Sequence, residues 1–296
     1  MVAITRRATV GAIVAAGLSP GWLALAQNTR PITAREVFAR IKTASEQKWD
    51  PNPTDDRIIY GALDAPITGI ATCFFASVEV LRAARAAGLN YIVPHECSFY
   101  ERYDDFAESA VRDDDPTLSA KKKFVRDNRL VIQRMHSHAH SMAGDFIATG
   151  LLAQLDWARY RVEGGPRLMV RVPAASALEI GRHIKQRCGR RTLRMFGDPA
   201  QTVSTISISA GMPGENVQIT QMETPGVEAV LLGEVREPEV LGYAQDLAAR
   251  RPMVVYLVGH TAEDYGMRLV AEWLQGVFPT LPCRWFPLTD PYSNPV

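Results

Sequence analysis

The segment LVIQRMHSHAHSMAGD, residues 130–145, couples an apolar run to three histidines at alternate positions. Side chains two residues apart lie on one face of a strand, so a strand continuing here would point His136, His138 and His140 the same way. The segment therefore predicts a cluster of imidazoles at the end of a buried strand. Taken alone, the three histidines are just as typical of two exposed surface residues and one residue that caps the next helix. The rest of the chain must distinguish between these two interpretations.

Apolar strands and amphipathic helices alternate on both sides of this segment. Thr33 and Glu36 form a capping-box pattern at the start of the first helix, and Ser77 and Gly88 bound the second. A strand, a helix and a further strand imply parallel strands with a right-handed crossover. Before residue 158 we expect strands at 67–75, 91–93 and 130–135, and helices at 78–87, 118–127 and 145–155.

The second half of the chain repeats this alternation. The predicted fold is therefore α/β, with two β-α-β lobes, residues 27–158 and 159–296, whose mixed or parallel sheets are flanked by helices. Ligands of such sheets bind at the carboxyl ends of the strands, which places the expected site between the lobes. The expected strands are 168–172, 192–196, 203–209, 227–232, 254–258 and 283–286, and the expected helices are 174–188, 238–250 and 268–277.

The first 26 residues are typical of an export signal that is removed from the mature protein. Thr5-Arg6-Arg7 is a twin-arginine motif, residues 8–18 are weakly apolar, and Ala24-Leu25-Ala26 fits a small-x-small cleavage site. The alternative is a membrane anchor, but glycines and a proline interrupt the run, which is shorter than the roughly 20 apolar residues of a span. We expect a periplasmic or secreted protein without stable membrane insertion after cleavage.

Composition excludes one class of partner and leaves the redox state open. The chain has 33 Lys and Arg against 32 Asp and Glu, so no positive surplus exists to bind nucleic acid. The four cysteines include no C-x-x-C pair and therefore form no zinc-ribbon or redox motif. One or two disulfides fit an oxidising compartment, although Cys73 sits in an apolar run that is typical of a core.

Three predicted strands end in potential metal ligands, which include five of the six histidines. Because the carboxyl ends of parallel strands lie together, these ligands can converge on one place. A mixture of imidazole and carboxylate suits a borderline divalent metal such as Zn, Mn, Fe, Co or Ni. The alternative for the two acids is that the macrodipole of the last helix favours them in its first turn. The three groups are His95 with Glu96, then His136 to His140, and His260 with Glu263 and Asp264.

These strand ends make the chain resemble the Nif-three-like family, also called dinuclear-metal-centre hexameric proteins and in part type-two GTP cyclohydrolase homologues. That family has a strand ending in His-His, a second with His followed four residues later by Asp, and a late Gly-His with Glu four residues beyond. The resemblance covers residues 32–292 and implies an α/β fold, a metal pair and a ring-like hexamer, with a smaller oligomer such as a trimer also open. It rests on His95-Glu96, His136 with His140, Gly259-His260 with Asp264, residues 193–199 and 203–209, Gly211, Gly214 and Gly233-Glu234.

The chain departs from the family pattern at three ligand positions. Glu96 replaces the second His, His140 replaces the Asp that resembles a bridging ligand, and Asp264 replaces Glu, with Glu263 as its rival. Since an imidazole cannot bridge two metals as a carboxylate does, one metal, or two held further apart, is open beside the metal pair that the resemblance implies. The predicted metal ligands are His95, Glu96, His140, His260 and Asp264, and the predicted catalytic residues are His136, His138 and Glu263.

The expected function is hydrolysis by a metal-activated water, which attacks an amide, cyclic amide or related C–N bond of a small molecule. Tyr100 and Glu101 could face that substrate, or their loop could pack over the site or against a neighbouring subunit. One alternative is a metal-binding or assembly protein without turnover. Another is a cysteine hydrolase that uses Cys97 beside His95.

Overall fold

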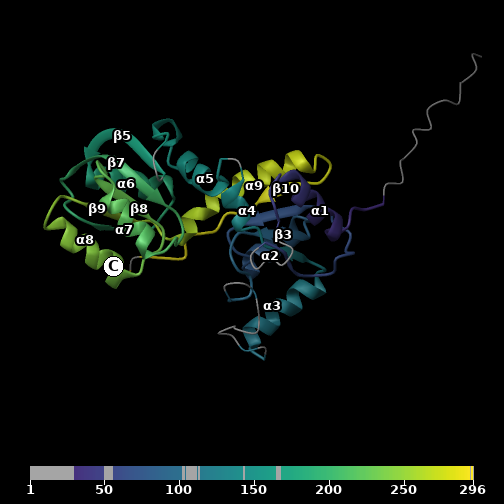
Figure 1. Ribbon diagram of the computed structural model, residues 1–296. Coiled ribbons are helices and arrows are strands. Elements are labelled where there is room, and N and C mark those ends of the chain that lie inside the picture. Colours follow the sequence, from purple (N-terminus) through teal and green to yellow (C-terminus); the bar gives the residue numbers. More distant parts are fainter. Residues whose placement is uncertain are drawn as a thin grey trace, which may run out of the picture. The chain divides into compact units, whose positions relative to one another are not determined.

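The computed structural model describes residues 30–49, 56–101, 104, 112, 114–142, 144–164, 168–293 and 295 (Figure 1). The predicted signal peptide, residues 1–26, lies outside the described residues. Pro31–Val296 form one compact unit. Within the described part of the chain, no helix is both long and apolar enough to cross a membrane.

The first sheet has five strands in the order β1-β4-β3-β2-β10, and all but β1 run parallel. The strands β2 and β3 are buried along their whole length, as expected when helices cover both faces of a parallel sheet. The strands are β1 (Ile58–Tyr60), β2 (Ile70–Cys73), β3 (Tyr91–Pro94), β4 (Val131–Gln133) and β10 (Cys283–Trp285). The helices of this half are α1 (Ala34–Ala44), α2 (Val78–Ala86), α3 (Pro116–Asp127), α4 (Ser137–Ser141), α5 (Phe146–Gln154) and α9 (Asp264–Val277).

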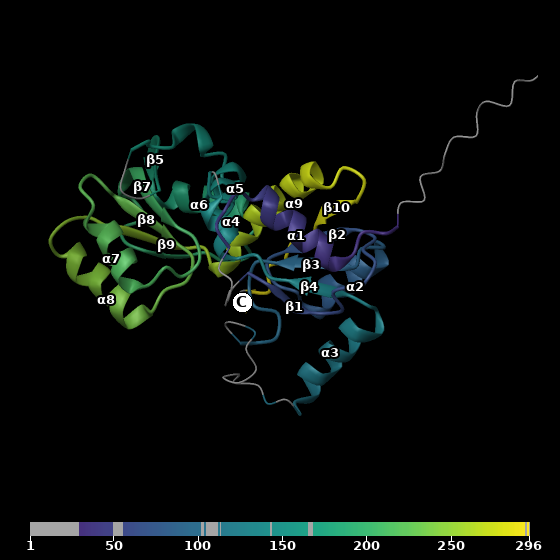
Figure 2. The same cartoon turned by 45° about the vertical axis from the view of Figure 1, so that its right-hand side comes forward.

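The second sheet has the order β5-β7-β8-β9-β6, with parallel β7, β8 and β9 between antiparallel edges (Figure 2). A mixed α/β fold with two five-stranded sheets confirms the predicted fold class. The strands are β5 (Met169–Ser176), β6 (Arg194–Phe196), β7 (Thr202–Ser209), β8 (Ala229–Leu232) and β9 (Val254–Leu257). The helices are α6 (Ala177–Arg187), α7 (Glu215–Glu223) and α8 (Glu237–Ala248), with short 3-10 helices at η1 (Ala158–Tyr160) and η2 (His260–Glu263).

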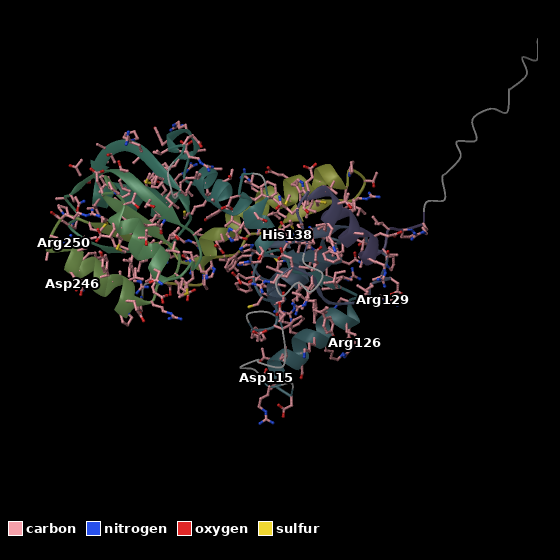
Figure 3. All side chains as sticks on the ribbon, viewed as in Figure 1. Asp115, Arg126, Arg129, His138, Asp246 and Arg250 are labelled. Carbon is pink, nitrogen blue, oxygen red and sulfur yellow. The ribbon has the colours of Figure 1, made fainter. Side chains whose placement is uncertain are left out.

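Side-chain caps fix where several helices begin. The capping box predicted at Thr33 and Glu36 is present, and Ser77 accepts a hydrogen bond from the backbone N–H of Val80 at the start of α2. Asp115 caps α3 in the same way, and Figure 3 labels it at the opposite end of that helix from Arg126. The helix starts are thus local consequences of the sequence.

The end of the chain returns to the first sheet, although the predicted division placed it in the second lobe. β10 pairs in parallel with β2, and the Thr72 hydroxyl donates to the carbonyl of Met267 in α9 at 2.7 Å. The yellow α9 and β10 accordingly lie beside the blue strands in Figures 1 and 2. Gly150 in α5 allows a close crossing with α9, because a Cβ there would lie 2.5 Å from the backbone N of Gly266. This crossing packs α5 against the first turn of α9, directly after η2.

The prediction that three histidines share one strand face is wrong. The strand β4 ends at Gln133, and the chain turns into α4. The cause is the carboxylate of Asp56, which accepts hydrogen bonds from the backbone N–H groups of His136 and His138. Two short elements, β1 and α7, were also not predicted. β1 has only three residues, and α7 buries the polar side chains Gln218 and Gln221 instead of an apolar stripe.

Candidate metal centre

Six side chains from three strand ends converge on one place. One pair follows β3, a second pair lies in and just before α4 after β4, and a third pair belongs to η2 after β9. Two sets of three among them each place their ligand atoms within 4.8 Å of one another. The sets are His95, His136 and His140, and His95, Glu96 and Glu263. His260 completes the group of six, the His/Glu cluster.

Three of these histidines are held through Nδ1. His95 Nδ1 lies 3.3 Å from the carbonyl oxygen of Met135. His260 Nδ1 lies 2.9 Å from Glu234 Oε2, and His140 Nδ1 lies 3.5 Å from an oxygen of Asp145. Metal-binding histidines are typically held in this way by a carboxylate or a backbone carbonyl, which fixes the tautomer and the orientation of the ring.

The Nε2 atoms of the same histidines face the carboxylate of Glu263. His95 Nε2 and His260 Nε2 each lie 3.2 Å from Glu263 Oε2, and His140 Nε2 lies 3.8 Å from Glu263 Oε1. His95 Nε2 and Glu263 Oε2 are nevertheless buried without a hydrogen-bond partner of acceptable geometry among the described residues. Unpaired buried polar atoms are costly, and a shared divalent ion would satisfy both. The residues present therefore fit a metal.

Glu96 is oriented from the other side by Arg134, which is buried. The guanidinium of Arg134 lies 3.2 Å from Glu96 Oε2 and donates through Nε to the carbonyl of His95. The other oxygen, Oε1, faces His260 Nε2 at 3.2 Å and His136 Nε2 at 3.6 Å. One oxygen of Glu96 thus pairs with Arg134, and the other faces the histidines of the cluster.

The protonation states of the metal-free cluster follow from these contacts. Burial opposes ionisation of Glu96, but His260 and the other histidines lower its pKa to about 2, and the same effect holds the pKa of Glu263 well below its usual range. Burial also lowers the pKa of His260, yet the neighbouring carboxylates of Glu263, Glu96 and Glu234 raise it to about 11. For His136, burial and the neighbouring His95 lower the pKa to about 4. Both acids are therefore ionised at neutral pH, as metal ligands must be.

His138, expected to act in catalysis, lies outside the cluster (labelled in Figure 3). Its Nδ1 hydrogen-bonds to Asp56, and its ring stacks on Trp49 with a centroid separation of 3.6 Å. In a helix, residues two apart point in different directions, whereas residues four apart share a face. The helical turn therefore brings His136 and His140 together and turns His138 away.

Asp264, expected to be a metal ligand, also lies outside the cluster. Its oxygens accept hydrogen bonds from Trp285 Nε1 at 3.0 Å and from the backbone N–H of Leu288 at 2.8 Å. Residues three apart eclipse one another in a 3-10 helix, so η2 aligns His260 with Glu263. Asp264 instead ties the chain after β10 to the start of α9.

The loop after β3 does not bring a thiolate to the site. Burial, together with the acids Asp104 and Glu96, raises the pKa of Cys97, so its thiol is not activated as a nucleophile. Tyr100 is 44% exposed, and its ring lies over Lys121, with Nζ 4.9 Å from the centroid. The aromatic loop thus packs on this buried lysine.

Several supporting residues were missed from the sequence. Arg134 and Asp56 act across long sequence separations and leave no local signal. Gly211, in contrast, belongs to the quoted family pattern, and its φ of +63° and the Glu263 carboxylate beside it explain why glycine stands there. Glu234, next to Gly233 in the same pattern, holds His260.

Comparison with known proteins identifies a family and several solved structures that share this fold. A family model described as Duf34/NIF3 (NGG1p interacting factor 3) matches residues 36–289. The hypothetical protein SA1388 from Staphylococcus aureus is 12% identical with a TM-score of 0.68, over 89% of this chain and 99% of that one. A Bacillus cereus protein related to NIF3 is 14% identical with the same TM-score and coverage. The protein ybgI, of unknown function, is 21% identical with a TM-score of 0.66, over 90% of this chain and 100% of that one.

At these identities the solved structures show a common fold and nothing of the chemistry. Comparison with curated proteins gave no match. The chemistry of this chain must therefore be argued from its own cluster.

Proposed function

The chain belongs to the Duf34/NIF3 family, and from this premise and the geometry of its His/Glu cluster we propose that it is a metal-dependent hydrolase. The family match confirms the resemblance found in the sequence. The substrate class is a small molecule with an amide, cyclic amide or related C–N bond. A bound divalent ion of Zn, Mn, Fe, Co or Ni would supply Lewis acidity, which makes water nucleophilic near neutral pH.

One observation carries this proposal: the cluster is sealed on one side and open on the other. His95 and Glu263 are buried, and their facing atoms lack hydrogen-bond partners among the described residues. The side chains of His136, His140 and His260 are 29%, 34% and 29% exposed. A catalytic metal site needs such an open position for water and substrate, whereas structural sites are closed.

We assign one ion per chain to the cluster. Both sets of three potential ligands contain His95, whose Nδ1 is occupied by the carbonyl of Met135. His95 thus has a single nitrogen to offer, and an imidazole nitrogen binds one metal. In this assignment the ion is held by His95, His140, His260, Glu96 and Glu263, with Glu263 in the role first given to Asp264.

His136 is assigned to proton transfer. Its Nε2 lies 3.6 Å from Glu96 Oε1, and its side chain is half-buried at the open side of the cluster. Hydrolysis joins the water oxygen to the carbonyl carbon and breaks the C–N bond. With a pKa of about 4, His136 is neutral at neutral pH and holds a proton only in passing. The proton lost by the water passes through its Nε2 to the departing nitrogen, so the imidazole ends neutral, as it began.

Export and assembly form part of the same proposal. Arg6, Arg7 and the small residues Ala24 and Ala26 support twin-arginine export to the periplasm or the medium, followed by cleavage. The family resemblance supports a homo-oligomer, a trimer or a hexamer. Amino-terminal sequencing of the exported protein and its mass in solution would test both statements.

A metal-binding or assembly protein without turnover is the second candidate. It is favoured by the depth of the central ligands, since His95 and Glu263 are only 0% and 2% exposed.

Metal analysis and an activity screen of the purified mature protein separate the two functions. We expect about one metal per chain and hydrolysis of at least one amide or cyclic amide substrate with Mn, Zn or Fe present. Hydrolysis of phosphoesters alone would contradict the C–N substrate class. His260→Ala should lose both, whereas His183→Ala should retain both, because His183 lies on α6 and contacts Leu155. Bound metal without turnover supports the second candidate, and no binding of any of these metals refutes both.

A further inference from the structure

A cavity of about 640 Å³ lies at the carboxyl ends of β8 and β9, beside the His/Glu cluster. Its lining includes Glu234 and His260. The Nδ1 edge of the His260 ring faces Glu234, and the Nε2 edge faces Glu96 and Glu263. One imidazole is therefore shared by the cavity and the cluster. The volume suits a small-molecule ligand.

The two acidic side chains of the cavity are already engaged. Glu234 Oε2 is bonded to His260. Asp290 accepts one hydrogen bond from the backbone N–H of Arg191 at 2.7 Å and another from that of Tyr292 at 3.2 Å. Glu234 is therefore paired with an imidazole, and Asp290 is held by two backbone N–H groups.

The donors of the cavity are less well satisfied. Arg194 is paired with Glu237 at 2.5 Å. The guanidinium of Arg190 makes no hydrogen bond or ion pair with any described residue, and its Nε is buried without a partner in that part of the chain. The hydroxyls of Thr192 and Thr261, which also line the cavity, have no hydrogen-bond partner among the residues that the structure describes. The cavity thus offers a buried guanidinium N–H of Arg190 and the hydroxyls of Thr192 and Thr261 as hydrogen-bond donors.

We propose that this cavity binds the anionic end of the substrate, a carboxylate or a phosphate group, at Arg190. A guanidinium beside two hydroxyls is suited to either anion, because its planar N–H groups can donate in pairs to two oxygens. The uncharged C–N bond of the same molecule then lies toward His260. This inference rests on the proposed function and narrows its substrate to small acidic molecules.

Titration of the metal-free mature protein with two anions tests the inference. Inorganic phosphate and succinate are each followed by calorimetry and by the shift in melting temperature. We expect wild type to bind at least one of them, and Arg190→Gln to bind it at least tenfold more weakly, about 1.4 kcal/mol. Arg190→Lys should recover part of the loss. The stronger ligand identifies the anionic group that the cavity prefers.

Arg182→Gln is the matched control, since Arg182 is exposed on α6 and does not line the cavity. It should bind both anions as wild type does. The inference is overturned if wild type binds neither anion, or if Arg190→Gln and wild type bind equally. Metal binding is measured in a separate titration of the same proteins. A failure there would refute the proposed function while leaving the anion result readable.

Discussion

Replacing Gly211 by alanine should separate the metal site from the stability of the fold. The Cβ would lie 2.1 Å from Glu263 Oε1 and 2.8 Å from the carboxyl carbon, far inside contact distance. The clash is with the end of a side chain, so the carboxylate, and not the backbone, has to move. An alanine at φ +63° costs about 1–2 kcal/mol, which sets the expected loss of stability.

Displacing Glu263 takes its carboxylate away from the Nε2 atoms that it faces in the cluster. We expect metal affinity to fall by about 10–100-fold, the usual effect of losing support for a ligand. Competition with a chromophoric chelator measures affinity, and urea denaturation of the metal-free protein measures stability. Gly88→Ala is the control, because its φ is +78° and no atom lies within 4 Å of the added Cβ. A folded Gly211→Ala protein with wild-type affinity would refute the reasoning, as would an equal loss in the control.

Three further predictions concern the cluster and its supports. Glu263→Gln should lower metal affinity at least tenfold in chelator competition. Asp264→Asn should leave metal affinity unchanged and lower the free energy of unfolding by about 1–3 kcal/mol in urea denaturation, because it weakens buried hydrogen bonds. The reverse pattern would restore Asp264 as the ligand. Arg134→Ala should lower the free energy of unfolding by about 3 kcal/mol, because Glu96 loses its buried partner, and Arg134→Lys should lower it by less. Urea denaturation curves of Arg134→Ala that match wild type would show that the carboxylate of Glu96 needs no cation. Burial lowers the pKa of metal-free His260, but the neighbouring carboxylates raise it to about 11. Because an imidazole must be neutral to bind a metal, metal binding near pH 8 should release about one proton from His260. Metal affinity should therefore rise about tenfold for each pH unit, as long as the pH stays below the pKa of His260. Calorimetry in buffers of different ionisation enthalpy counts the protons released, and a count of zero would contradict this prediction.

The sequence predicted which strand ends carry the candidate site, but not which side chains at those ends point into it. The apolar runs before His95, His136 and His260 set the strands, and the carboxyl ends of parallel strands then had to meet. The direction of each side chain beyond the strand end depends on the type of helix that follows the strand. A 3-10 turn selects Glu263 over Asp264, and nothing in the local sequence distinguishes it from an α-turn.

Long-range contacts account for the remaining differences. The helical turn of α4 depends on Asp56, which lies about 80 residues earlier and accepts from the backbone of His136 and His138. The orientation of Glu96 depends on Arg134, 38 residues later. Since neither contact is visible in a local pattern, the alternating histidines were interpreted as one strand face.

The central claim is that a metal binds in the His/Glu cluster, and anomalous diffraction from crystals of the metal-loaded protein tests it most directly. Data on both sides of the absorption edge of the metal give its identity, position and number per chain. We predict one peak, at about 2.0–2.2 Å from His95 Nε2 and from the carboxylate of Glu263. A peak bound instead by His138 or Asp264, or no peak in the cluster after loading, would contradict the account.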